Sequence, residues 1–249
     1  MHLVSVLIGT ALVIASACVF NNYIDRCIDA KMDRTKRRAL VSGRISTISA
    51  LSYASLLGIV GLAVLVSGTN WLTVGLGLLA FFVYVVVYGI AKRRTVHSTV
   101  IGSIAGAIPP VAGYTAMSNR LDGGAVLLFL ILVCWQMPHF YAIAMYRYKD
   151  YKAAGLPILT VKKGMRAAKL QILFYVVAFG ISASLLTIFG YTGYIYLLVI
   201  LGLSLNWLRL GLAGLKTKDD EKWARKMFFY SLIVTLSLSF MLAVGGLLP

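Results

Sequence analysis

The chain has 249 residues, of which 60% are hydrophobic and only 13% are charged, and its mean hydropathy is +0.86. A soluble chain of this length could not hide so much apolar surface in one core, so the composition excludes an ordinary globular protein, a disordered chain and a fibrous repeat. Lysine and arginine outnumber aspartate and glutamate by 24 to 8. In a membrane protein that excess is typical of loops on the cytoplasmic side rather than of nucleic-acid binding.

Eight continuous apolar runs follow one another along the chain, and a membrane-spanning helix needs about 20 apolar residues. No charged residue lies near the middle of any run, and continuous runs favour helices over the short alternating segments of a membrane β-barrel. We therefore predict an all-α polytopic membrane bundle of about eight transmembrane helices, organised as a single domain over residues 1–249. The runs are residues 3–20, 46–68, 71–90, 98–118, 124–146, 169–189, 191–213 and 227–248.

Basic residues gather in every second connection between these runs. All of them except Arg120 lie in the stretches 21–45, 92–94, 147–169 and 209–226. The positive-inside rule places those stretches in the cytoplasm and both termini outside. The first run starts at Met1 without a basic leader, so we expect either that it inserts as a hairpin with its neighbour or that an N-terminal helix is missing.

The connection after the first run begins with a polar stretch that has a helical pattern. At about 100° per residue, its amide and carboxylate side chains fall within a stripe about 120° wide if the first helix continues, while Cys27 faces the other way. Like charges one turn apart destabilise a helix, so the stripe predicts a cationic partner, and Mg²⁺, which binds carboxylates, waters and substrate phosphates, suits it. The alternative is a solvated loop whose acids and bases pair internally. The stripe consists of Asn21, Asn22, Asp25, Asp29 and Asp33.

A second polar stretch follows the fifth run, in residues 135–152. On helical spacing His139, Tyr146 and Asp150 share one face. The more ordinary interpretation of His139 is a hydrogen-bonded core histidine, and that of Asp150 is an ion pair to Arg147 or Lys149 at the membrane edge. Because the first and fifth helices run in the same direction, both polar stretches lie at cytoplasmic helix ends, and we expect them to face each other.

Two basic groups, residues 36–38 and 92–94, are candidates for binding a diphosphate at this edge. Arginine makes two-pronged contacts with phosphate oxygens, which suits such a ligand. For any single one of these residues, the positive-inside rule alone is a sufficient explanation.

The pattern Asn21-Asn22-x-x-Asp25-x-x-x-Asp29 resembles the N-D-x-x-D-x-x-x-D motif of the UbiA superfamily of intramembrane prenyltransferases. Four further segments resemble the branch of that superfamily that farnesylates heme, and Trp-Gln-Met-Pro-His at 135–139 is specific to that branch. The similarity runs from about residue 5 to the carboxyl terminus. The other three segments are residues 106–114, 146–151 and 220–226.

Two departures of the chain from the superfamily's pattern bear on its fold and its site. Members have nine spans with a cytoplasmic N-terminus, so the resemblance implies that the first helix is the one missing from this sequence. The second motif of the superfamily commonly has two carboxylates, whereas here Tyr146 stands at the earlier position and Asp150 at the later one.

The resemblance implies transfer of a farnesyl group from farnesyl diphosphate to a vinyl group of heme b, with addition of water and release of diphosphate, giving heme O. It implies a Mg²⁺ cofactor held by Asp25, Asp29 and Asp150, with Tyr146 as a further catalytic residue. It also implies a bacterial inner membrane, and a heme A synthase or terminal oxidase downstream as user of the product. The implied substrate-binding residues are Asn21, Asn22, Arg34, Arg38, Lys92, Arg93, Arg147, Trp135 and His139.

Three alternatives stay open on the sequence. A quinone-pathway prenyltransferase with an aromatic acid acceptor shares the acidic motif, although the segment 135–139 favours heme. A small-substrate transporter usually carries its ionisable residues near the membrane midplane, whereas here they gather at helix ends. A non-catalytic remnant is the third alternative, because the resemblance implies that the first helix is missing.

Overall fold

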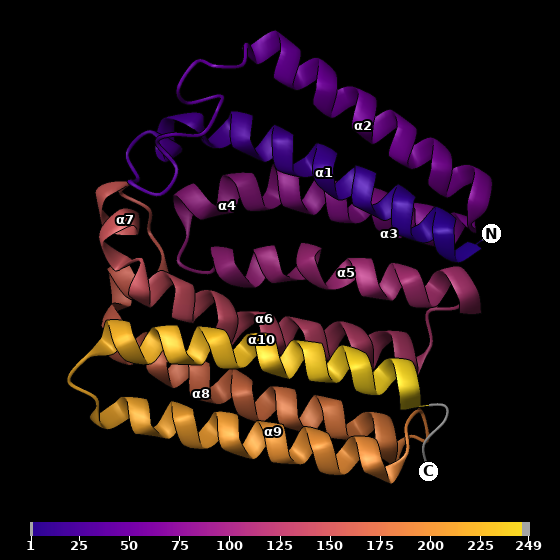
Figure 1. Ribbon diagram of the computed structural model, residues 1–249, viewed down its shortest axis with the longest axis vertical. Coiled ribbons are helices and arrows are strands. Elements are labelled where there is room, and N and C mark those ends of the chain that lie inside the picture. Colours follow the sequence, from indigo (N-terminus) through magenta and orange to yellow (C-terminus); the bar gives the residue numbers. More distant parts are fainter. Residues whose placement is uncertain (1, 246–249) are drawn as a thin grey trace. The chain divides into compact units, whose positions relative to one another are not determined.

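The computed structural model describes residues 2–245, and this part of the chain is helical with no strand (Figure 1). The chain divides into two compact units, which are described separately. The first consists of the residues up to Leu121 together with Lys149–Pro157, and the second of Asp122–Tyr148 together with the residues from Ile158 on. The elements are α1 (His2–Asp29), α2 (Thr47–Gly68), α3 (Trp71–Phe82), the π-helix η1 (Val83–Tyr88), α4 (Gly89–Arg94), α5 (Ser98–Ser118), α6 (Gly123–Tyr146), α7 (Tyr148–Ala153), α8 (Leu159–Ile188), α9 (Tyr194–Ala213), the 3₁₀ turn η2 (Gly214–Lys216) and α10 (Asp220–Val244).

Within the described residues, eight helical segments are long and apolar enough to cross a membrane, which confirms the predicted number of spans. The segments α3, η1 and α4 together make one of them. Helix α1 extends well beyond its apolar run and reaches Asp29 rather than residue 20, because backbone hydrogen bonding continues into polar sequence. Helix α8 begins at Leu159 rather than residue 169, but a kink at Gly164, whose backbone angles are not helical (φ 85°, ψ 173°), interrupts it. The chain is therefore a multi-pass membrane protein whose helix ends carry polar residues.

Small residues bring α1 and α2 close together in the first unit. A methyl group added at Gly61 would come within 2.9 Å of the backbone nitrogen of Val13, so only glycine permits this approach. One turn further along, the Ser16 hydroxyl donates a 2.7 Å hydrogen bond to the carbonyl of Ala54. Lipid gives spanning helices no hydrophobic reason to associate, so such small and hydroxyl-bearing contacts are what hold them in contact.

The third span contains a π-helical stretch, η1, between two α-helical ones. Its wider turn places the rings of Tyr84 and Tyr88 in a stack with centroids 5.7 Å apart. The ammonium of Lys92 lies over the Tyr88 ring, 5.1 Å from its centroid. Short π-helical turns inside α-helices are frequent at functional sites, and this one ends one helical turn before the basic residues at the end of the span.

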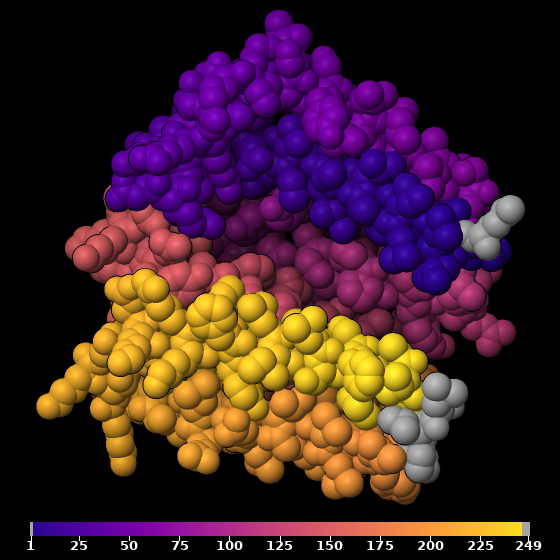
Figure 2. Space-filling model, in the orientation of Figure 1, coloured from indigo at the N-terminus to yellow at the C-terminus, as the bar shows by residue number. Residues whose placement is uncertain are grey.

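The second unit packs α6, α8, α9 and α10 around a core of large side chains. Phe179 of α8 and Trp207 of α9 are fully buried, with ring centroids 5.7 Å apart. The space-filling view shows the side chains of α10 (yellow) lying along those of α9 (orange) in Figure 2. Other fully buried members of this core are Ile131, Ile172, Ile200, Met227 and Val234.

The corner between α9 and α10 depends on Trp223. Its indole nitrogen donates a 2.8 Å hydrogen bond to the carbonyl of Leu210, and the ammonium of Lys169 lies 5.6 Å from its ring centroid. That ammonium is also 2.5 Å from a carboxylate oxygen of Asp220. The ring covers Gly214 so closely that a methyl group added there would lie 2.2 Å from a ring atom.

We expect Gly214→Ala to lower the free energy of unfolding by about 1–3 kcal/mol, the usual cost of overpacking, because the Trp223 ring is held by its hydrogen bond and cannot move aside. Gly202→Ala on α9 is the matched control, since nothing lies within 4 Å of the added methyl group. Alanine should stabilise that helix position by up to about 1 kcal/mol. Denaturant unfolding in detergent, followed by circular dichroism, measures both, and equal stabilities for the two variants would contradict this description of the corner.

Candidate active site

The polar stripe lies at the carboxyl-terminal end of α1, which continues as an unbroken helix to Asp29. This confirms the helical reading of the stripe as far as that residue. The carboxylates of Asp25 and Asp29 are buried, with residue exposures of 7% and 5%. Asp33 lies beyond the helix and is exposed, so the stripe is one residue shorter than expected. Two neighbouring carboxylates held away from solvent require cationic partners.

Lys92 supplies one of these cations from the end of α4. Its ammonium forms an ion pair with Asp25 and donates a 2.9 Å hydrogen bond to the side-chain oxygen of Asn21. Lys92 is itself buried, with 7% of its surface exposed. Arg93 adds a longer contact of 3.4 Å to the other oxygen of Asp25 and donates to the backbone carbonyl of Ile24. Asp25 therefore meets two basic groups.

Arg38 supplies the cation for the other carboxylate, from the loop after α1. One guanidinium nitrogen, Nη1, lies 2.6 Å from an oxygen of Asp29 and 2.9 Å from the side-chain oxygen of Asn22. The loop turns back toward α1 because the Thr35 hydroxyl donates a 3.0 Å hydrogen bond to the backbone carbonyl of Asp29. Each of the two buried carboxylates is thus matched with one asparagine and at least one basic side chain.

The oxygen atoms of this cluster suit a hard divalent cation. Mg²⁺ is usually held by one or two carboxylates, with substrate phosphates and waters completing its six positions. Asp25 and Asp29 offer two carboxylates one helical turn apart, and these pair with Lys92 and Arg38 respectively. Among residues 2–245 there is no group of three acidic, histidine or cysteine side chains arranged around a metal position.

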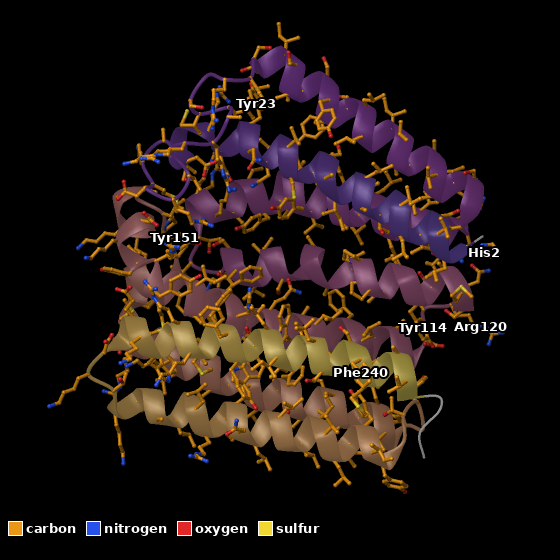
Figure 3. All side chains as sticks on the ribbon, in the orientation of Figure 1. His2, Tyr23, Tyr114, Arg120, Tyr151 and Phe240 are labelled. Carbon is orange, nitrogen blue, oxygen red and sulfur yellow. The ribbon has the colours of Figure 1, made fainter. Side chains whose placement is uncertain are left out.

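Asp150 lies in α7, which belongs to the first unit for most of its length. One of its oxygens accepts a 3.1 Å hydrogen bond from the backbone nitrogen of Asp33. Figure 3 shows Tyr23 and Tyr151 at the same end of the first unit, with His2 at the other end. The structure therefore brings Asp150 to the end of the unit that carries the stripe, but into contact with the loop after α1 rather than with Asp25 or Asp29.

Two other charged residues of that loop make no contact with the buried carboxylates. Arg34 is exposed and has no ion pair within the described part of the chain. Asp33 is 2.6 Å from the ammonium of Lys36, and that hydrogen bond lowers the pKa of the Asp33 carboxyl.

An aromatic cluster occupies the second unit, around the segment 135–139. The His139 ring stacks on Trp135 with centroids 5.0 Å apart and packs against Phe228 at 4.9 Å. Its Nδ1 is 2.8 Å from the hydroxyl oxygen of Ser231, and the Trp135 indole donates a 2.8 Å hydrogen bond to the Ser231 carbonyl. Tyr146 packs edge-on against Phe228 at 5.7 Å. His139 and Tyr146 therefore share a face of α6, as their spacing predicts.

The expectation that Asp150 continues this face is wrong. Helix α6 ends at Tyr146, Arg147 caps it with non-helical backbone angles, and α7 starts afresh at Tyr148. The guanidinium of Arg147 lies 5.4 Å from the Tyr146 ring centroid, and that of Arg225 lies 5.7 Å from it. Two cations near one phenol ring give this end of α6 a positive environment.

Sequence reasoning missed Phe228, Ser231 and the stacked pair Tyr84 and Tyr88. All four lie in apolar spans, where a single aromatic or hydroxyl residue is ordinary. A usable signal was the three-residue spacing of Phe228 and Ser231, which places both on one face of α10.

Residues 1–233 match the model of the UbiA prenyltransferase family. The chain is 50% identical to a protoheme IX farnesyltransferase of Enterobacter sp. (strain 638) and 51% identical to one of Pectobacterium atrosepticum, in each case over 98% of this chain and 83% of the relative.

Two solved structures share the fold at low sequence identity. A digeranylgeranylglyceryl phosphate synthase matches with a TM-score of 0.79 and 20% identity, over 97% of this chain and 84% of that one. A UbiA homolog from Archaeoglobus fulgidus, bound to GPP and Mg²⁺, matches with a TM-score of 0.67 and 18% identity, over 98% and 88%. With its membrane helices, its acidic stripe and a family match that runs through both units, the chain belongs to the UbiA prenyltransferase family.

Proposed function

We propose that this chain transfers a farnesyl group from farnesyl diphosphate to a vinyl group of heme b, with addition of water, giving heme O. The observation that carries the donor half is the buried pair Asp25 and Asp29, each matched with a basic side chain at the end of α1. The acceptor half is supported by the identity of 50% to proteins named protoheme IX farnesyltransferase, over nearly the whole chain.

The reaction balances without an oxidant or reductant. The bond between C1 of the farnesyl group and the diphosphate oxygen breaks, and diphosphate leaves with the electron pair. C1 bonds to one vinyl carbon, and the oxygen of water bonds to the other. The proton released from water leaves with the diphosphate, so the products are heme O and hydrogen diphosphate.

The residues of the first unit would bind the diphosphate. Asp25 and Asp29 would hold a Mg²⁺ ion, oriented by Asn21 and Asn22, and when bound the ion neutralises charge on the leaving group. As the substrate enters, Lys92 and Arg38 would move from the carboxylates to phosphate oxygens, with Arg93 and Arg34 beside them. Asp150 lies at the same end of the unit, where it accepts a hydrogen bond from the loop after α1. It would be the third acidic residue of the site.

The residues of the second unit would bind the heme acceptor. Trp135 and Tyr146 present aromatic faces of the kind that stabilise an allylic cation, and Arg147 is a counter-ion for a heme propionate. His139 would contact the heme iron. The family match runs through both units, which supports treating residues 1–249 as one prenyltransferase domain.

The orientation that we propose places the basic connections in the cytoplasm of a bacterium and the helices in its inner membrane. This orientation is supported by the basic residues, which lie in alternate connections between the spans, as the positive-inside rule describes for cytoplasmic loops. The heme O formed there would pass to a heme A synthase or to a terminal oxidase.

The test is to express the chain in bacterial membranes, extract the hemes and identify them by mass spectrometry. We expect a new heme heavier than heme b by one farnesyl group and one hydroxyl group, and its loss in the Asp25→Asn variant. A prenylated aromatic acid with unchanged heme b would replace this proposal with a quinone-pathway activity. Membranes that contain the folded protein and both substrates but form neither product would also overturn it.

A further inference from the structure

We propose that Ser231 is a positioning residue that fixes His139 in the tautomer with the proton on Nδ1, so that Nε2 carries the free electron pair offered to the heme iron. The inference rests on the proposed function for the identity of the metal. The tautomer itself follows from hydrogen-bond geometry on α6 and α10, independently of any substrate.

The hydroxyl group of Ser231 has a single proton to donate. Its oxygen lies 2.6 Å from the backbone carbonyl oxygen of Phe228. Two oxygens at that distance without a proton between them would place lone pair against lone pair, and a carbonyl has no proton to give. The hydroxyl proton therefore points to Phe228.

The same hydroxyl oxygen is 2.8 Å from Nδ1 of His139. Because the only hydroxyl proton is already used, the serine oxygen can take part in this second hydrogen bond only as an acceptor. Nδ1 must then carry a proton and donate it. In neutral imidazole only one nitrogen is protonated, so Nε2 is left as the acceptor.

The surroundings hold the ring in this orientation. Trp135 stacks on His139 at 5.0 Å and is itself tied to Ser231 through its indole hydrogen bond to the carbonyl. Phe228 and Phe140 pack against the histidine at 4.9 and 5.2 Å. Ser231, which is fully buried, thus holds both end residues of the segment 135–139. Its backbone carbonyl binds Trp135, and its hydroxyl binds His139.

The other ring nitrogen is left available. Within the described residues Nε2 of His139 has no hydrogen-bond partner, and it is not sealed in the core. The buried side-chain atoms without a partner in that part of the chain belong to Thr160, Ser204 and Trp207. Proteins present histidine to a metal in this arrangement: one ring nitrogen has a free electron pair that is open to a ligand, and the other ring nitrogen is held by a hydrogen bond.

The tautomer can be read directly by ¹⁵N NMR of protein labelled at histidine, in nanodiscs and without heme. The chain has three histidines, and His139→Gln identifies the signals of His139 by their loss. We expect Nδ1 protonated and Nε2 unprotonated in the unsubstituted protein. Ser231→Ala should mix the two tautomers, and Ser231→Thr, which keeps the hydroxyl, should restore the first.

Ser204→Ala on α9 is the matched control, because it removes a buried hydroxyl that has no hydrogen-bond partner. It should leave the histidine signals unchanged. A protonated Nε2 in the unsubstituted protein would overturn the inference, and that measurement does not depend on whether Ser231→Ala folds.

The role toward iron is tested by titrating ferric heme b and following the Soret band and the electron paramagnetic resonance spectrum. We expect a nitrogen-ligated signal that is absent in His139→Gln. Losing the hydrogen-bond partner of a metal-binding histidine typically weakens metal affinity about 10–100-fold, so Ser231→Ala should bind heme more weakly by that factor while binding of farnesyl diphosphate stays unchanged.

If the chain makes farnesylated heme but His139→Gln leaves the spectrum unaltered, this inference fails and the proposed function stands. If no farnesylated heme forms, the proposed function itself fails.

Discussion

Replacing Asp25 or Asp29 with asparagine is expected to slow farnesyl transfer about 10²–10³-fold, the usual cost of removing one group that stabilises charge in a transition state. Asparagine keeps the size and hydrogen bonding of the side chain but removes its charge. The carboxylates matter most as charge builds on the leaving diphosphate, so the loss should appear in kcat rather than in KM. Turnover of farnesyl diphosphate by purified protein in nanodiscs, measured by product mass spectrometry, gives both constants.

Two exposed residues of the same region serve as controls. Cys27 is exposed on the opposite side of α1, and Asp33 is an exposed acid paired with Lys36. Cys27→Ser and Asp33→Asn should therefore keep nearly normal rates. Near-normal rates in well-folded Asp25→Asn and Asp29→Asn enzymes would show that the stripe is an ordinary polar helix face.

Stability must be separated from chemistry in this test, because Asp25→Asn leaves the buried ammonium of Lys92 without its carboxylate. An unpaired buried charge destabilises a protein strongly. The double variant Asp25→Asn with Lys92→Gln removes both charges, so it should recover much of the stability of the unsubstituted protein. Its turnover should stay low, and recovery of turnover together with stability would mean that Asp25 acts only through folding.

Chelation of divalent cations is expected to abolish turnover, and added Mg²⁺ to restore it. In the structure Lys92 and Arg38 pair with the carboxylates that would bind the ion. These cations can leave the carboxylates readily only when phosphate oxygens receive them. We therefore expect tight binding of Mg²⁺ only in the presence of a diphosphate, which isothermal titration with and without a non-reactive farnesyl diphosphate analogue would measure.

The Asp29→Asn variant tests whether the Mg²⁺ ion is bound at the stripe. With one carboxylate lost, the Mg²⁺ concentration for half-maximal turnover should rise at least about 10-fold, because even a hydrogen-bond partner of a metal ligand is worth that much in affinity. Cys27→Ser should keep the normal midpoint. Full activity in excess chelator, or equal Mg²⁺ midpoints for Asp29→Asn and Cys27→Ser, would exclude a metal bound at the stripe.

Much of the fold was predictable because hydropathy and helical spacing are local properties. Each stretch of apolar residues predicts one spanning helix, so the number of spans and most of their bounds follow from the amino-acid sequence alone. The shared face of Asp25 and Asp29 on α1 follows in the same way, since residues four apart in a helix share a face, whereas their burial does not. The break after Tyr146 was not predicted, because Arg147 and the residues around it are compatible with a continuing helix and no proline or glycine marks the end.

The amino-acid sequence by itself determined that this is a helical membrane protein with acidic residues aligned at one helix end and a tryptophan and histidine one turn apart on another. Only the tertiary structure decided which groups meet. Lys92 reaches Asp25 across 67 positions of sequence, and Ser231 reaches His139 across 92. Several basic residues lie near the stripe, and α10 has several serines, so local pattern cannot choose among them. The choice depends on helix packing, which sets the few side-chain pairs whose atoms come within hydrogen-bond distance.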